Sequence, residues 1–327
     1  MPLTREKAIL ARMRAPEDSS SARHTVRLDG RLRRRVGARA AGLVAVAVLL
    51  GSAVSGCAGT PVPPKADKQA ETVTASLTMR AALPRPTPTR IGNATPAPSW
   101  LGTRVLPVGP QGYAAAQPTP PELRNRSIIT VDDLPPPADG RFHATVQAVP
   151  AGVLARSSWT KKCPIAAADL RYLTVSFRGF DGRAHTGELL ANARVADDLV
   201  TVFKRLFAAG FPIERMRISS AAELNAPSTG DANTTEVFAC RPVRGRKGWS
   251  QHAYGLAVDL NPFQNPYRKG KVVLPELATA YLDRAETRPG MAQPREQAVQ
   301  AFAAIGWEWG GDYRSLKDYM HFSATGG

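Results

Sequence analysis

Apolar and polar positions alternate along residues 171–180, a pattern typical of a half-buried strand. The apolar positions of one face are Leu173, Val175 and Phe177. Successive side chains of a strand point to opposite faces, so this face should lie against a core. The Asp181-Gly182 pair that follows is a turn signal, and the strand should end there.

Apolar positions recur every three or four residues along residues 193–209, which predicts a helix. The shared apolar face carries Val195, Leu199, Val202, Phe203, Leu206 and Phe207. Gly210 follows as a stop signal. The same reasoning predicts a second helix over residues 296–305, ended by Gly306.

The remaining pattern of the C-terminal half consists of short segments. Residues 215–219 and 319–323 read as short strands, and residues 256–260 form a short apolar run. Strands and helices are interspersed without regular βαβ units, which favours the α+β class. We therefore expect one compact domain over residues 140–327, with a small antiparallel sheet flanked by helices.

Residues 57–139 lack this periodicity and are rich in Pro, Ala and Thr, as in the runs LPRPTPTR and ATPAPS. Such a segment buries too little apolar surface to offset the entropy lost on ordering. The composition predicts an extended, mostly disordered tether ahead of the domain.

Residues 1–56 read as a secretory signal segment, with an over-long start that a misplaced start codon would explain. The Arg-rich residues 31–39 precede an apolar run of roughly 15 residues, shorter than the roughly 20 that a membrane-spanning helix needs. The last four residues, Val54-Ser55-Gly56-Cys57, resemble a bacterial lipobox, which implies lipidation of Cys57 and cleavage just before it. A simple signal peptide with an incidental cysteine is the alternative.

The chain has three cysteines. If Cys57 carries lipid, Cys163 and Cys240 remain, and two cysteines in an exported domain commonly pair. We therefore expect a disulfide between them, and two buried free thiols are the alternative.

The segment WSQHAYGLAVD, residues 249–259, places His252 seven residues before Asp259 with Gly255 between them. A turn at Gly255 could fold both side chains onto one metal ion. Together with the later His321, two imidazoles and one carboxylate make a three-ligand set that leaves a position for water, as in catalytic zinc sites. A structural zinc site usually has four protein ligands and more cysteine.

These residues resemble the zinc D-alanyl-D-alanine carboxypeptidase and L-alanyl-D-glutamate endopeptidase family, the VanY-like peptidoglycan metallopeptidases. The family pattern is Ser-x-His, six residues, Asp, and later an acid three residues before a final His. This chain has Ser250, His252, Asp259, Asp318 and His321 at those spacings. Cys240-Arg241-Pro242, Asn261-Pro262 and the Trp-Gly-Gly-Asp at 309–312 extend the resemblance, which covers about residues 165–323.

The resemblance and the chemistry together imply a role for each residue. His252, Asp259 and His321 would hold Zn²⁺, and Asp318 would be the general base. Arg241 would stabilise the oxyanion, because a guanidinium stays charged. Ser250 would bind substrate or support a ligand. Asp318 and His321 cannot both point into one site from a straight strand, so a bend between them is required.

The resemblance implies a metallopeptidase that cuts peptidoglycan stem peptides, and the sequence leaves carboxypeptidase and endopeptidase equally open. The rival hypotheses are a catalytically silent wall-binding lipoprotein with the same fold and a zinc hydrolase of other small peptides. The formal charge of +16 fits anionic wall polymers, since no nucleic-acid motif is present. We expect a monomer outside the cytoplasm, lipid-anchored to the outer face of the membrane or secreted.

Overall fold

The computed structural model describes residues 94–110, 112–243 and 246–326. The predictions for residues 1–56 and for lipidation of Cys57 fall outside these ranges. Within them, no helix combines the length and the apolar character needed to cross a membrane.

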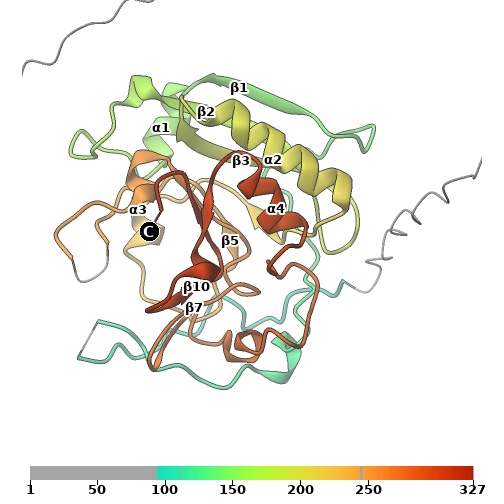
Figure 1. Cartoon of the computed structure of the whole chain (residues 1–327), viewed down its shortest axis with the longest axis vertical. Helices are drawn as coiled ribbons and strands as arrows, with labels where there is room; N and C mark the ends of the chain where they lie inside the picture. Colours follow the sequence, from blue (N-terminus) through green and yellow to red (C-terminus); the bar gives the residue numbers. More distant parts are fainter. Residues whose placement is uncertain (1–93, 111, 244–245, 327) are drawn as a thin grey trace, which may run out of the picture. The chain divides into compact units, whose positions relative to one another are not determined.

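The largest sheet confirms the predicted strand and supplies the platform of the domain. Its antiparallel strands, in the order β1-β2-β3, are β1 (Ala144–Ala148), β2 (Leu170–Arg178) and β3 (Ala184–Asn192). The Asp181-Gly182 turn joins β2 to β3, with Gly182 at a φ of 77°. The helix α2 (Ala196–Ala209) packs on β2, and α4 (Gln297–Ala303) lies beside α2 (Figure 1).

Three further small sheets complete the α+β architecture. They are β6-β11-β9 (Ala257–Asp259, His321–Ser323, Glu308–Trp309), β10-β7-β8 (Lys317–Asp318, Tyr267–Lys269, Val272–Leu274) and the parallel pair β4-β5 (Arg215–Met216, Thr234–Thr235). The short helices are α1 (Ala151–Arg156), α3 (Ala221–Leu224), η1 (Pro121–Leu123), η2 (Ala167–Asp169), η3 (Gln251–Tyr254), η4 (Thr279–Leu282) and η5 (Gly310–Asp312). The predicted class is therefore confirmed, with the strands divided among several sheets.

An aromatic stack fixes the strand that carries the last predicted metal ligand. Phe322 of β11 is fully buried and stacks on Phe302 of α4, with 4.0 Å between ring centroids. Adjacent strand residues point to opposite faces, so burial of Phe322 in the core turns the neighbouring His321 out of it. Trp309 of β9 lies opposite Phe322 in the strand register and also stacks on its ring, with 6.4 Å between centroids.

The structure corrects the predicted domain boundary at residue 140. Residues 94–139, which the composition assigned to the tether, pack against the domain. Leu123 and Ile128 are buried in a second apolar cluster with Tyr281, and the Thr119 hydroxyl donates to the Leu277 carbonyl at 2.6 Å. The Pro-rich composition was misleading here because the ordering is supplied by partners far along the chain.

A buried ion pair fastens this segment to the domain. The Arg126 guanidinium binds both carboxylate oxygens of Glu214, at 2.8 and 2.6 Å, and donates to the Asp231 carbonyl at 2.7 Å. The side chains of Arg126 and Glu214 are only 2 % and 9 % exposed. Each charge is thus paired and hydrogen-bonded, the condition under which buried ions are tolerated.

Cys163 and Cys240, the pair expected from the sequence, are joined by a disulfide with 5.8 Å between their Cα atoms. The bond connects chain positions 77 residues apart. The Cys240 amide also donates to the Ser158 hydroxyl at 3.0 Å. Both contacts anchor the backbone immediately before Arg241.

Replacing Arg126 with Met should destabilise the protein by about 3–5 kcal/mol, because Glu214 is left as a buried, unpaired charge. Urea unfolding measures the loss. Arg215→Met is the matched control, since its ion pair with Asp133 is 40 % and 31 % exposed and should cost only about 0–1 kcal/mol. Equal losses in the two variants would show that residues 94–139 are not fastened through Arg126.

Candidate metal centre

A tight turn presents the first imidazole of the centre. His252 lies in η3, where the Ser250 hydroxyl caps the turn by accepting from the His252 amide at 3.4 Å. Gly255 ends the turn at a φ of 66°, and a Cβ there would stand 2.6 Å from the Asn192 amide nitrogen. Both the conformation and the close approach require glycine. The predicted turn at Gly255 is therefore present and leads directly into β6.

Strand pairing brings the other two predicted ligands together. Asp259 of β6 lies directly opposite His321 of β11 in the antiparallel register. The Asp259 main chain is already hydrogen-bonded on its other edge to Glu236. Asp259 and His321 thus form a non-hydrogen-bonded pair, the type whose side chains approach most closely.

The three ligand atoms form a small triangle. His252 Nε2 is 3.2 Å from His321 Nδ1 and 3.2 Å from Asp259 Oδ1, and His321 Nδ1 is 3.1 Å from the same oxygen. His252 Nδ1 donates to the Val237 carbonyl at 2.8 Å. Because a carbonyl can only accept, the proton sits on Nδ1 and the Nε2 lone pair faces the triangle.

This donor set fits a divalent cation. Tetrahedral zinc with bonds of about 2.0–2.1 Å holds its ligand atoms about 3.3 Å apart, close to the three distances found here. Two imidazoles and one carboxylate are ligands that zinc takes, and the Val237 carbonyl supplies the supporting hydrogen bond common around zinc-bound histidine. Within the described residues, His252, Asp259 and His321 form the group able to hold a metal.

Asp318 lies in β10 and reaches the centre from a different sheet. Two turn residues separate the end of β10 at Asp318 from the start of β11 at His321, which is the bend that the sequence required. The Asp318 Oδ1 atom is buried and has no hydrogen-bond partner among the described residues. Gly310 permits this placement, because a Cβ there would lie 2.4 Å from the Asp318 carbonyl oxygen.

The surroundings of the triangle shift the pKa values of two carboxyl groups, Asp318 and Asp259, in opposite directions. Burial and then the negative charge of Asp259 raise the pKa of Asp318 to about 7, against the opposing charges of His321 and Arg241. Burial also opposes ionisation of Asp259, but His252 and His321 hold the pKa of Asp259 well below its usual range. One carboxylate is thus a permanent anion and the other is poised to gain or lose a proton.

Arg241 stands near this cluster without a hydrogen-bond partner for its guanidinium among the described residues. Its charge lowers the pKa of Asp318 and of Glu236. The Arg241 carbonyl accepts from the Ser250 amide at 3.2 Å, so Arg241 is tied both to the disulfide and to the turn that carries His252.

Glu236 is a residue of the site that the sequence reasoning missed. It opposes Asp259 in an antiparallel bridge, with main-chain hydrogen bonds of 3.2 and 3.0 Å, so both carboxylates lie on the same face. The Ser219 hydroxyl donates to Glu236, and burial raises the pKa of Glu236. The available signal was a lone acid next to the apolar run at residues 237–239.

In metal-free protein, the titration of Asp318 should lower the free energy of unfolding as pH rises. Its pKa is about 7 in the folded state against an ordinary value of 3.8, so the folded chain holds an extra proton between those values. Asp318→Asn should remove this component. Urea unfolding at about pH 5 and about pH 8 with a chelator tests it, with the exposed Asp312→Asn as control. An unchanged pH dependence in Asp318→Asn would contradict the assignment.

Comparison with known proteins finds a family whose sequence pattern matches part of the chain. Residues 244–324 match the family model described as D-alanyl-D-alanine carboxypeptidase. No solved structure matches the chain. The matched segment contains His252, Asp259, Asp318 and His321, whereas Cys240 and Arg241 precede it. Residues 244–324 are thus similar to the D-alanyl-D-alanine carboxypeptidase family, and the resemblance inferred from the motif is confirmed there.

Proposed function

We propose that the protein is a zinc peptidase that hydrolyses peptide bonds in peptidoglycan stem peptides. The family match supports peptidoglycan peptidase activity at the level of the family. The observation that carries the metal assignment is the triangle of ligand atoms at 3.1–3.2 Å. The choice between a carboxypeptidase and an endopeptidase is left to the experiment below.

His252, Asp259 and His321 would hold the zinc ion. When bound, zinc would polarise the scissile carbonyl. It would also lower the pKa of a bound water molecule, so that this water could lose a proton and attack near neutral pH. The chain contributes by fixing the tautomer of His252 through Val237 and by holding the Asp259 carboxylate against both imidazoles. The positive ion would also attract the lone pairs that the three ligand atoms direct toward one another.

Asp318 would act as the general base. Its buried Oδ1 has no partner among the described residues, which leaves an acceptor free to take a proton from the attacking water. The same carboxyl would return that proton to the leaving amine. A bound divalent cation would lower the pKa of Asp318 below its metal-free value of about 7, so that the base is ionised at neutral pH.

Arg241 would offset the negative charge that develops on the carbonyl oxygen. A guanidinium remains charged throughout the reaction and presents several donors. Its free donors and its position beside the acidic cluster support this role. Ser250 is engaged in capping the His252 turn, and its contact with substrate remains a prediction.

The location outside the cytoplasm follows from the substrate class, since peptidoglycan lies beyond the cytoplasmic membrane. Lipidation of Cys57, attachment to the outer membrane face and the monomeric state remain predictions. The rival hypothesis of a silent wall-binding protein is disfavoured by Asp318, because a binder gains nothing from a buried, unpaired carboxylate oxygen.

His252→Ala should weaken zinc binding by more than about 100-fold, since losing even a supporting contact of a ligand typically costs 10–100-fold. Zinc content by elemental analysis measures the effect. His143→Ala is the matched control, because the His143 side chain is exposed and, among the described residues, bonds only to Asp139. Full zinc retention in His252→Ala would falsify the ligand assignment.

Asp318→Asn should keep zinc and lower kcat by about 10²–10⁴-fold, the scale of general-base loss. Purified stem peptides are digested with each variant, and mass spectrometry distinguishes loss of the terminal residue from internal cleavage. Asp312→Asn, at an exposed acid of η5, is expected to keep wild-type turnover. No product from the zinc-loaded wild-type protein would instead favour the silent binder.

A further inference from the structure

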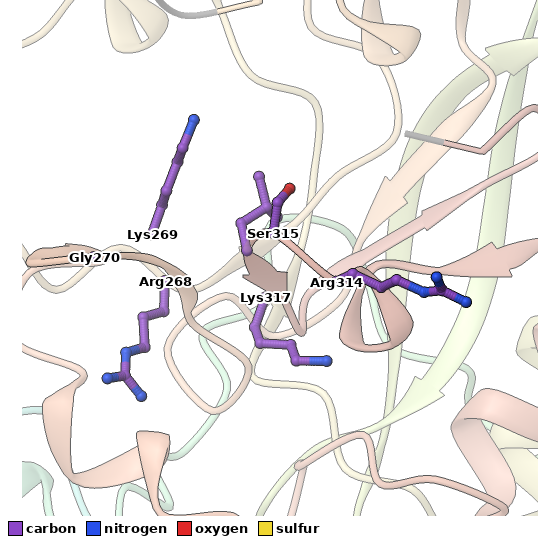
Figure 2. A pocket seen from close by; sticks show the side chains of 7 residues that line it. Arg268, Lys269, Gly270, Arg314, Ser315 and Lys317 are labelled. Carbon is purple, nitrogen blue, oxygen red and sulfur yellow. The ribbon is translucent and has the colours of Figure 1, made fainter.

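Two basic segments that are far apart in the sequence meet beside β10. Residues 268–271 read Arg-Lys-Gly-Lys, and residues 314–317 read Arg-Ser-Leu-Lys. Antiparallel pairing of β10 with β7 places Lys317 directly opposite Arg268. The side chains of Arg268, Lys269 and Arg314 are exposed around this point (Figure 2).

The two segments line a pocket of about 250 Å³. Four of its seven lining residues are Arg or Lys, and none is acidic. Asp318, the nearest acid along β10, points to the opposite face from Lys317 because adjacent strand residues alternate. Arg268 lies opposite Lys317 and shares its face, whereas Lys269 lies on the face of Asp318. The side chains of Arg268 and Lys317 are therefore turned away from the carboxylates of the candidate metal centre.

The cations of this pocket lack anionic partners within the described ranges. The side chains of Arg268, Lys269 and Arg314 form no hydrogen bond or ion pair there, and Lys317 donates only to the Gly311 carbonyl, at 2.9 Å. Like charges directly opposite each other in a sheet, such as Arg268 and Lys317, are destabilising. An anion bound beside them would offset this repulsion.

The directions of the side chains indicate the shape of that anion. Figure 2 shows Arg268 and Lys269 extending to opposite sides of their strand, while Arg314 points away from both. Arg268, Lys317 and Arg314 lie away from the side of Lys269 and diverge from one another, so these three cations do not converge on one small anion. A chain of negative groups that passes over the pocket can contact them in succession.

We propose that the basic surface formed by Arg268, Arg314 and Lys317 binds a linear polyanion that carries phosphate or carboxylate groups. This binding function is additional to the proposed peptidase activity and uses none of its residues. The surface includes the strand that ends at Asp318. A polymer bound there would therefore hold the candidate metal centre close to the material to which the polymer is attached. The attraction is electrostatic and weakens as salt is added.

The test uses the full-length protein and two fluorescent probes of similar charge, inorganic polyphosphate and poly-L-glutamate. The site variant is Arg268→Glu with Arg314→Glu. The Glu at position 268 lies opposite Lys317, and a pair of opposite charges across the strands favours the fold. The control is Lys204→Glu with Arg205→Glu on exposed positions of α2, which changes the net charge equally. Thermal melting and zinc content verify that both variants are folded.

At low salt, the site variant should bind at least one polymer roughly tenfold or more weakly than wild type, because two charge-assisted contacts are lost. The control should lose much less, and the polymer that binds wild type more tightly identifies the anionic group. Equal weakening in both variants would mean that only net charge matters and would overturn the proposal. So would unchanged binding in the site variant, or competition by inorganic phosphate as effective as polyphosphate at equal phosphate concentration.

Discussion

The structure is organised around a close approach of three polar side chains that the surrounding chain must hold in place. Two imidazole nitrogens and one carboxylate oxygen lie within 3.2 Å of one another, each directing electron density toward the others. Only a shared proton or a cation makes such an arrangement favourable, so the surrounding framework has to hold it in place. The register of β6 with β11 and the turn closed by Gly255 provide that framework.

The groups that would perform catalysis come from elements with separate supports. The proposed ligands lie on one sheet and one turn, Asp318 lies on a second sheet, and Arg241 follows a disulfide. Burial of Phe322 turns His321 outward, and Gly310 leaves room for Asp318. Packing on the far side of the backbone therefore aims His321, and the close approach at Gly310 positions Asp318.

Charge is distributed unevenly over this basic protein. Glu236, Asp259 and Asp318 gather at the centre, where burial raises the pKa of Glu236 and Asp318. Arg268, Lys269 and Arg314 lie on the exposed surface without an anionic partner among the described residues. A positive ion is attracted to the first region and a negative polymer to the second, so the two proposed functions rest on opposite local fields in one small fold.

The sequence by itself determined the elements with a local period and the proposed metal ligands with a fixed spacing. The strand around Leu173, the helix ended by Gly210 and the His252–Asp259 motif depend on residues close together in the chain. Tertiary structure alone decided the ordering of residues 94–139, because Arg126 finds Glu214 88 residues away. It likewise placed Glu236 opposite Asp259 and Lys317 opposite Arg268. Contacts of this kind join segments that share no sequence period, so only packing and strand register create them.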